Sequence, residues 1–328
     1  MSSVASILKA AARPRARGER GSAWREAALD MLIGGWGDVP AAVQRLARLA
    51  PDDAATRLLQ AAVETLQPQP TSREAVRRWL DGVAPTPLGD ALLAWAHGDE
   101  DAAADAADAA ARSDPHDRLA LFIAHRFDFA VGHGERMRDR LDAALRAWPR
   151  RRRGRAGLVA LHAFALADAG DAADSARAAR RGPVHDGRSP RAVHAVVHAL
   201  HARGDIAGVV GWLARRAAHW LHRGAVATHL WWHLAVAKLA LGDVPAARAL
   251  LADELLPHAA ASPSALGDAS DLVGRLGVLP APLAGVASRL SDLWARRWLG
   301  DATALQLLLA GLCHVRAGQP ARVAATLA

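Results

Sequence analysis

Two pairs of histidines, each spaced four residues apart, are the residues of this sequence best suited to chemistry. The first pair, His194 and His198, lies in AVHAVVHALHARGD; the second, His229 and His233, lies in ATHLWWHLAVAKLALGD. Residues i and i+4 of a helix lie on one face, so each pair directs both imidazoles the same way. Imidazole nitrogens bind divalent metals and transfer protons near neutral pH. Each pair is therefore a candidate for metal binding or acid–base catalysis.

Each pair precedes a Gly-Asp dipeptide, which gives the helices a common frame. With the closing glycine of each helix as zero and about 100° per residue, the four histidines fall between about 80° and 180°. Counted back from Gly277, Asp268 and Asp271 fall at about 180° and 120°. We therefore expect three successive helices to direct imidazoles and carboxylates toward one sector. The first helices of a solenoid line its concave surface, so the sector predicts an internal pocket.

The predicted pocket leaves two interpretations open. The side chains either bind a ligand, or are core polar groups that hydrogen-bond to one another and to the backbone. Partners are needed in both cases, because burying an unpaired polar group costs about 1–3 kcal/mol. A divalent metal is the cofactor that the pocket suggests, with the four histidines and Asp268 as its ligands, and no residue is assigned as catalytic. The ligand-binding candidates are His194, His198, His229, Trp232, His233, Asp268 and Asp271.

The elements that must position these residues repeat along the chain. Glycine suits the left-handed residue that ends a helix, and the Asp that follows four of the repeating glycines suits the cap of the next helix. A period of 34 to about 40 residues with two helices is typical of tetratricopeptide-type solenoids. The sequence therefore predicts an all-α fold, a right-handed superhelix of antiparallel helix pairs. The repeating glycines, in steps of 34, 38, 34, 38 and twice 38 residues, are Gly98, Gly132, Gly170, Gly204, Gly242 and Gly318.

The domain organisation follows from this repeat. Residues 1–21, rich in Ala, Arg and Gly, are expected to form a flexible basic segment. Residues 22–328 are expected to form one solenoid domain, with the clearest repeats in 85–256. Ser22 is expected to cap the first helix and Gly277 to end a later one. Further helices are predicted over 39–50, 54–66, 73–80, 191–203 and 226–241.

Composition narrows the class of protein. The 328 residues are 52% hydrophobic, and this favours helices because Ala and Leu dominate. A net charge of +8 invites a nucleic-acid interpretation, although GC-rich coding bias accounts equally well for the excess of Arg. The densest charge, Arg150–Arg153 with Arg155, lacks interleaved aromatic residues that would stack on bases. We interpret it as a solvated loop and keep a phosphate-binding patch as the alternative.

Several other classes of protein and site are not expected. Cys313 is the only cysteine, which excludes a disulfide framework and a cysteine-based zinc site. No apolar run reaches the roughly 18 residues that span a bilayer, and the basic start lacks the apolar run of a secretory signal. We expect a cytoplasmic protein without a membrane partner. His162, about 100° from the histidine sector, is a predicted packing residue, and RMRDRLD (136–142) a predicted exposed charge lattice.

Three motifs recur in one known family. Its V-H-x-V-x-H stretch is matched by residues 193–198, its H-x-W-W-H by residues 229–233, and its Asp before a Leu-rich helix by Asp268 with Arg275 and Leu276. Through these motifs residues 192–276 resemble the tetratricopeptide repeat protein 38 family, with a weaker likeness back to about residue 85. The resemblance implies a helical-repeat fold and a pocket at these residues, but no reaction. The chain departs from the pattern at His201, Leu230 and Asp271, where the family has Glu, Asn and more often Ser.

Three functions compete on this sequence. The first is an interaction module that holds a peptide or a partner protein in its concave groove. The second is a small-molecule pocket, or a small-molecule-processing enzyme assisted by a metal, that uses the His/Asp cluster. The third, ranked last, is a nucleic-acid solenoid that uses the loop 150–155. A pocket closed by apolar helices would indicate a small molecule, and an open groove a peptide.

Overall fold

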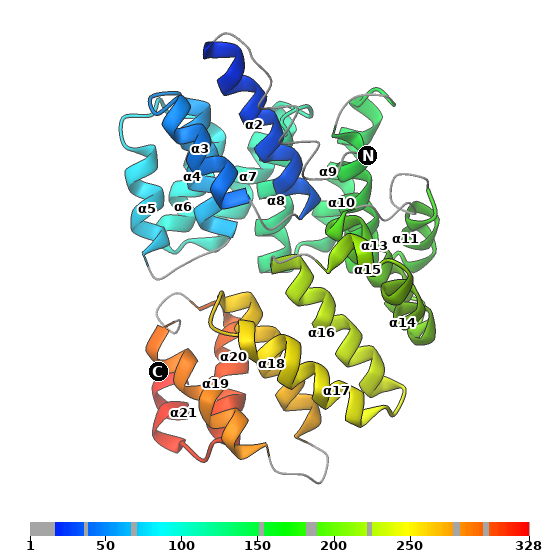
Figure 1. Ribbon diagram of the computed structural model, residues 1–328. Coiled ribbons are helices and arrows are strands. Elements are labelled where there is room, and N and C mark those ends of the chain that lie inside the picture. Colours follow the sequence, from blue (N-terminus) through cyan, green and yellow to red (C-terminus); the bar gives the residue numbers. More distant parts are fainter. Residues whose placement is uncertain are drawn as a thin grey trace. The chain divides into compact units, whose positions relative to one another are not determined.

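The computed structural model is helical throughout the residues that it describes (Figure 1). None of these residues lies in a β-strand, and helices that follow one another in the chain pack side by side. The all-α prediction is therefore confirmed, and the packing is compatible with an α-solenoid. The described ranges are 17–35, 39–66, 71–150, 154–181, 189–221, 225–277, 283–297 and 302–327.

The chain forms two compact units. The first comprises Met1–Asp205 and Arg215–Val226, and the second comprises Ile206–Ala214 and Ala227–Ala328. The predicted division into a flexible segment and one solenoid domain stays a prediction. The helices of the first unit are α2 (Arg17–Gly34), α3 (Val39–Leu49), α4 (Ala54–Leu66), α5 (Ser72–Leu80), α6 (Pro87–His97), α7 (Glu100–Ser113), α8 (Arg118–Val131), α9 (Gly134–Ala147), α10 (Arg155–Asp168), α11 (Ala172–Ala179), α13 (Pro190–His201) and α15 (Ala217–Trp220).

The second unit contains most of α14 and α16 and all of the later helices. A short π-helix, Leu251–Leu255, and a 3-10 turn, Leu256–His258, follow α17. Its core packs Leu266, Leu272 and Trp294 against one another. No described helix in either unit is both long and apolar enough to cross a bilayer. The helices are α14 (Ile206–Arg215), α16 (Ala225–Ala240), α17 (Val244–Leu250), α18 (Pro263–Leu276), α19 (Ala284–Arg297), α20 (Ala304–Arg316) and α21 (Pro320–Leu327).

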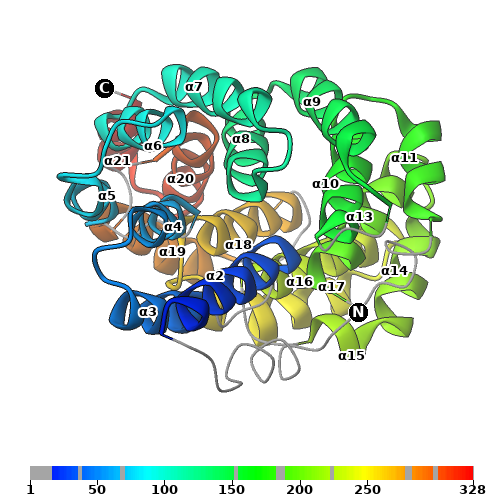
Figure 2. The ribbon, with the colours of Figure 1, turned by 90° about the horizontal axis from the view of Figure 1, so that it is seen from above.

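Small side chains let the helices of the first unit pack closely. Helices α7 to α11 follow one another side by side in chain order (Figure 2). The inward face of α7 consists of alanines such as Ala103, Ala104 and Ala107, which are fully buried. Because the distance between packed helix axes depends on the side chains at the contact, this alanine face brings α6 and α8 close to α7.

The repeating glycines end helices as predicted. All six have a positive φ, between 67° and 89°, a conformation that glycine adopts without a steric cost. Gly277 also ends a helix, α18, but with an ordinary helical φ of −70°. The repeating glycines therefore adopt a backbone conformation that ends a helix, and they mark the turn between the two helices of a pair.

The predicted aspartate caps are right at two positions and wrong at one. Asp99 accepts a hydrogen bond from the N–H of Ala102 at 3.0 Å, and Asp243 accepts one from Ala246 at 3.2 Å. Asp171 makes no such bond. Its carboxylate accepts a hydrogen bond from Arg138 of the preceding pair at 3.0 Å, so an ion pair between helices is present at this position and the local cap is not.

The predicted helix boundaries are mostly close to those observed. Helix α4 covers 54–66 as predicted, while α13 begins and ends one or two residues before the predicted 191–203. The cap prediction for Ser22 is wrong, because α2 already begins at Arg17. Residues 17–21, expected to be flexible, are therefore helical, and residues 1–16 lie outside the described ranges.

Helix α2 lies against the first helices of three pairs, α8, α10 and α13. A Cβ on Gly157 of α10 would collide with Ile33 of α2, so this glycine permits the contact. Arg118, at the start of α8, donates hydrogen bonds to Glu26 at 2.6 Å and to Asp30 at 2.5 Å. The face that these first helices present is thus covered, within the first unit, by the chain's own α2.

The segment 136–142 belongs in part to a buried ion network, whereas Arg138 pairs with the exposed Asp139 at the surface. Arg140 of α9 is only 2% exposed. It donates through Nη1 to Asp128 of α8 at 2.5 Å and to Asp108 of α7 at 2.6 Å. Arg136 donates through Nε to the same Asp128 at 2.6 Å. The prediction of an exposed lattice was wrong for Arg136 and Arg140, because helical spacing shows which charges share a face but not whether a neighbouring helix covers that face.

Candidate functional site

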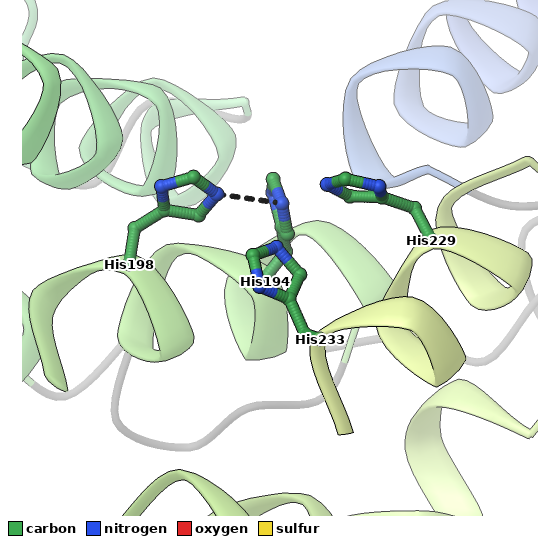
Figure 3. Close-up of side chains that lie close together, drawn as sticks. All are labelled: His194, His198, His229 and His233. Atoms are coloured by element: carbon green, nitrogen blue, oxygen red, sulfur yellow. Dashed lines mark hydrogen bonds between the residues drawn. The ribbon is translucent and has the colours of Figure 1, made fainter. Parts of the chain in front are cut away.

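The first histidine pair lies on α13. Ser189 caps this helix by accepting from the N–H of Ala192 at 3.3 Å, and Pro190 occupies its first turn. The spacing of four residues then brings Nε2 of His198 within 2.9 Å of Nε2 of His194 (Figure 3). One of these nitrogens must carry the hydrogen and the other must accept it. The two imidazoles therefore share a single proton position.

Phe164 of α10 supports this pair within the first unit. Its ring centroid lies 4.5 Å from that of His198 and 5.5 Å from that of His194. On its other side the same ring makes an edge contact with His125 of α8, at 5.3 Å. The aromatic contacts restrict the rotation of His194 and His198, which is the preorganisation that a ligand site needs.

The second pair lies on α16, a helix that is apolar nearly all round. His229 is 33% exposed at its side chain, whereas His233 is 4% exposed. Their ring centroids lie 4.6 Å apart, and each ring offers a nitrogen within 4.8 Å of one on the other ring. Both imidazoles leave adjacent turns of the same helix (Figure 3), so a single small ion can contact both.

Asp268 of α18 orients His229. Both carboxylate oxygens lie 3.0 Å from Nδ1 of His229. A carboxylate accepts hydrogen bonds, so Nδ1 carries the hydrogen and donates it. This tautomer makes Nε2 the nitrogen of His229 that can bind a metal or take up a proton. A carboxylate on the remote nitrogen is the usual arrangement behind a metal-bound histidine.

Trp232 and Asp271 complete the cluster of the second unit. The indole of Trp232 stacks on the imidazole of His229, with centroids 5.0 Å apart and planes 12° from parallel. Its Nε1 donates to Asp271 at 2.8 Å, and Arg275 donates to the same carboxylate at 2.6 Å. Asp271 therefore holds Trp232 in place, and Trp232 forms a flat wall beside the ligand nitrogen of His229.

Each unit thus holds part of the predicted site. The first contains His194 and His198, and the second brings together His229, Trp232, His233, Asp268 and Asp271. The meeting of the two histidine pairs at one site stays a prediction.

Two other candidates have structural partners. His162 of α10 is buried, and its Nε2 lies 3.0 Å from Asp142; burial lowers the pKa of His162, although the charge of Asp142 opposes this effect. Arg155 donates to the carbonyl oxygens of Leu145 at 2.8 Å and Trp148 at 2.7 Å, at the end of α9. Arg150 is exposed, and residues 151–153 lie outside the described ranges.

Sequence reasoning missed His125 and Arg126 on α8 and Arg191 on α13. His125 is only 3% exposed, and burial, followed by the charges of three arginines, holds its pKa well below the ordinary value. The signal is a His-Arg dipeptide inside the otherwise apolar stretch LALFIAHRFDFAV, which lies in the region of weaker family likeness.

Comparison with known protein families does not extend these observations, since no family model matches the chain. The resemblance to the tetratricopeptide repeat protein 38 family stays a prediction.

Proposed function

We propose that this chain is a helical-repeat protein that binds a divalent metal ion, zinc before others, and through the ion a small ligand. His229 and His233 of the second unit provide the imidazole ligands. Asp268 orients His229 from behind.

The contact between Asp268 and His229 carries this proposal. An imidazole that only fills space in a core needs one partner, and a backbone carbonyl is sufficient. Here a carboxylate 3.0 Å from Nδ1 fixes both the tautomer and the ring plane, as carboxylates commonly do for metal-bound histidines. This arrangement favours a cation or a proton at Nε2.

The histidine pair of the second unit favours zinc. Zinc binds imidazole nitrogens at about 2.0–2.1 Å, which sets two tetrahedral ligands roughly 3.3 Å apart. The ring centroids of His229 and His233 lie 4.6 Å apart, so the two imidazoles can reach one such ion. Imidazole ligands suit zinc, copper and nickel better than magnesium or calcium.

The position of α2 supports a small ligand over an extended peptide. In a helical-repeat protein a peptide lies along the first helices of successive repeats. Helix α2 covers α8, α10 and α13 in the first unit, and a peptide would have to displace it together with the ion pairs that Arg118 makes.

The repeat type and the location are part of the proposal. The six left-handed glycines at steps of 34 and 38 residues support tetratricopeptide-type repeats. We place the protein in the cytoplasm, where the buried thiol of Cys313 stays reduced.

Zinc titration against a chromophoric chelator tests the proposal. We expect one zinc per chain, and a loss of affinity of about 100-fold or more in His229→Ala and His233→Ala. His258→Ala, which removes an exposed histidine of the second unit, is the matched control and should bind zinc like the parent. Two independent zinc ions, or no zinc at all, would overturn the proposal.

The pair of His229 and Asp268 also supports an enzyme as the second candidate. A carboxylate that orients an imidazole through Nδ1 is the arrangement of a general base, which acts through Nε2. A panel of nitrophenyl esters and phosphates would test this function. Turnover that is lost in His229→Ala and kept in His258→Ala would favour the enzyme over the binding protein.

A further inference from the structure

Two arginines of the first unit, Arg126 of α8 and Arg191 of α13, point to a second binding site. Arg191 crosses from α13 to α8, where its guanidinium lies 4.8 Å from the centroid of Phe122. Its Nε donates to the carbonyl of Ile33 at 2.8 Å, which fixes the side chain and leaves its two terminal amino groups to other acceptors. The guanidinium of Arg126 lies 5.7 Å from the centroid of Phe129. Both arginines are half-buried.

The nearby carboxylates are engaged with other arginines. Asp128, two residues after Arg126, accepts hydrogen bonds from Arg136 and Arg140. Glu26 and Asp30 of α2 accept hydrogen bonds from Arg118. Within the described ranges, no carboxylate forms an ion pair with Arg126 or Arg191.

Both guanidinium groups lie along one stretch of α8, since Arg191 packs on Phe122 and Arg126 follows Phe122 by one helical turn. Burial, and then the charge of Arg126, lower the pKa of Arg191 to about 9, so Arg191 is still charged at pH 7. Burial alone lowers the pKa of Arg126. The charges of Arg140, Arg191 and Arg126 all act on the buried His125, whose Nδ1 makes no hydrogen bond to any described residue. The charges that act on this histidine are therefore positive.

Such an arrangement is costly unless an anion compensates it. Removing charges from water carries a penalty of several kcal/mol per ion, and only an opposite charge with good hydrogen bonds offsets it. Elsewhere in the first unit, Arg118, Arg136 and Arg140 each have carboxylate partners. Arg126 and Arg191 differ from them in this respect.

We propose that Arg126 and Arg191 form a binding site for a small oxyanion, the phosphate or carboxylate group of a small molecule, beside His125. The guanidinium fork matches two oxygens of such a group, and the packing of Arg191 on Phe122 holds its fork in place. The site uses residues of the first unit alone and is independent of the proposed metal site.

Isothermal titration with inorganic phosphate, in a buffer of low chloride content, tests this site. We expect saturable binding to the parent chain that weakens about tenfold or more in Arg126→Gln, because charge-assisted hydrogen bonds are lost. Arg126→Lys, which keeps the charge but not the fork, should retain part of the affinity. Arg146→Gln, which removes one exposed positive charge from α9, is the matched control and should bind like the parent.

A second measurement guards against a variant that fails to fold. Without phosphate, Arg126→Gln should melt no lower than the parent, since it removes one of two repelling charges, and phosphate should no longer raise its Tm. The same titration with acetate separates the two ligand groups: binding of acetate but not phosphate supports the site and makes its ligand a carboxylate.

The proposal fails if neither anion binds, or if Arg146→Gln weakens binding as much as Arg126→Gln does. Its failure is separable from that of the metal proposal, because Arg126→Gln should keep the zinc stoichiometry and His229→Ala should keep phosphate binding.

Discussion

Asp128 and Asp268 occupy comparable places in the two units, and their surroundings differ. Each lies on the first helix of a pair, α8 and α18 respectively, and each binds a cationic or titratable group. Asp128 is 0% exposed and accepts hydrogen bonds from Arg136 and Arg140. Asp268 is 14% exposed and contacts an imidazole that is itself 33% exposed.

The difference separates a group that stabilises the fold from one that can respond to a ligand. A guanidinium keeps its charge at every physiological pH, so the network around Asp128 has one state. An imidazole can exchange its proton for a metal ion, so the contact between Asp268 and His229 has at least two. Burial of a charge is therefore a weaker indication of function than a partner whose charge can change.

The largest expected effect on stability belongs to Asp128. Asp128→Asn leaves the buried Arg140 with less compensation and should lower the free energy of unfolding by about 3–5 kcal/mol. Urea denaturation measures this loss, and zinc affinity in the folded variant should not change. Asp52→Asn, at an exposed turn, should stay close to the parent. A loss no greater than in Asp52→Asn would show that the network does not stabilise the fold.

Asp268→Asn should lower zinc affinity and leave stability almost unchanged, which is the opposite of the expectation for Asp128→Asn. The amide no longer provides a negative charge behind His229, and zinc affinity should fall about 10–100-fold. The free energy of unfolding should change by less than about 1 kcal/mol, because the contact is partly exposed. Chelator competition and urea denaturation on the same preparation separate the two effects. If Asp268→Asn costs as much stability as Asp128→Asn does, the distinction between the two aspartates is wrong.

Acid should weaken the first unit through His125. Its pKa in the folded chain is well below the ordinary 6.5 because it is buried among cations, so the unfolded chain binds a proton that the folded chain does not. The free energy of unfolding should therefore not depend on His125 above about pH 6.5. Below that pH it should decrease, by at most about 1.4 kcal/mol per pH unit. Denaturation in phosphate-free buffer should show a shallower pH dependence in His125→Phe. An unchanged slope would assign the acid sensitivity to other groups.

The smallest effects concern the helix caps. Asp99→Ala removes a cap hydrogen bond and should cost about 1 kcal/mol. Asp171→Ala removes only a partly exposed ion pair with Arg138 and should cost less. Thermal unfolding of the two variants ranks them, and the reverse order would mean that Asp171 caps its helix in solution.

Much of the fold could be predicted because it depends on local rules. A glycine with a positive φ is required wherever one helix of a pair ends, and the glycines at 34 and 38 residue steps meet that requirement. The histidine spacing likewise places each pair on one helix face. Each of these features depends only on residues that lie within a few positions of it in the sequence.

The features that were missed depend on which helix covers which face. Arg140 lies in a segment whose charges alternate as on an exposed helix, yet α7 and α8 provide carboxylates that bury it. Arg191 contacts Ile33, 158 positions earlier in the chain, and helical spacing gives no indication of such a partner. For Asp268 and His229, helical spacing predicts only that the two side chains point toward the same sector. It does not predict that the carboxylate oxygens contact Nδ1.

Zinc-edge X-ray absorption on the loaded protein tests the central claim most directly, because it counts the ligands of the ion. The proposal predicts imidazole nitrogens at about 2.0–2.1 Å, and one fewer of them in His229→Ala. A shell of five or six oxygens, or the same spectrum from the parent and His229→Ala, would contradict a zinc site at His229 and His233.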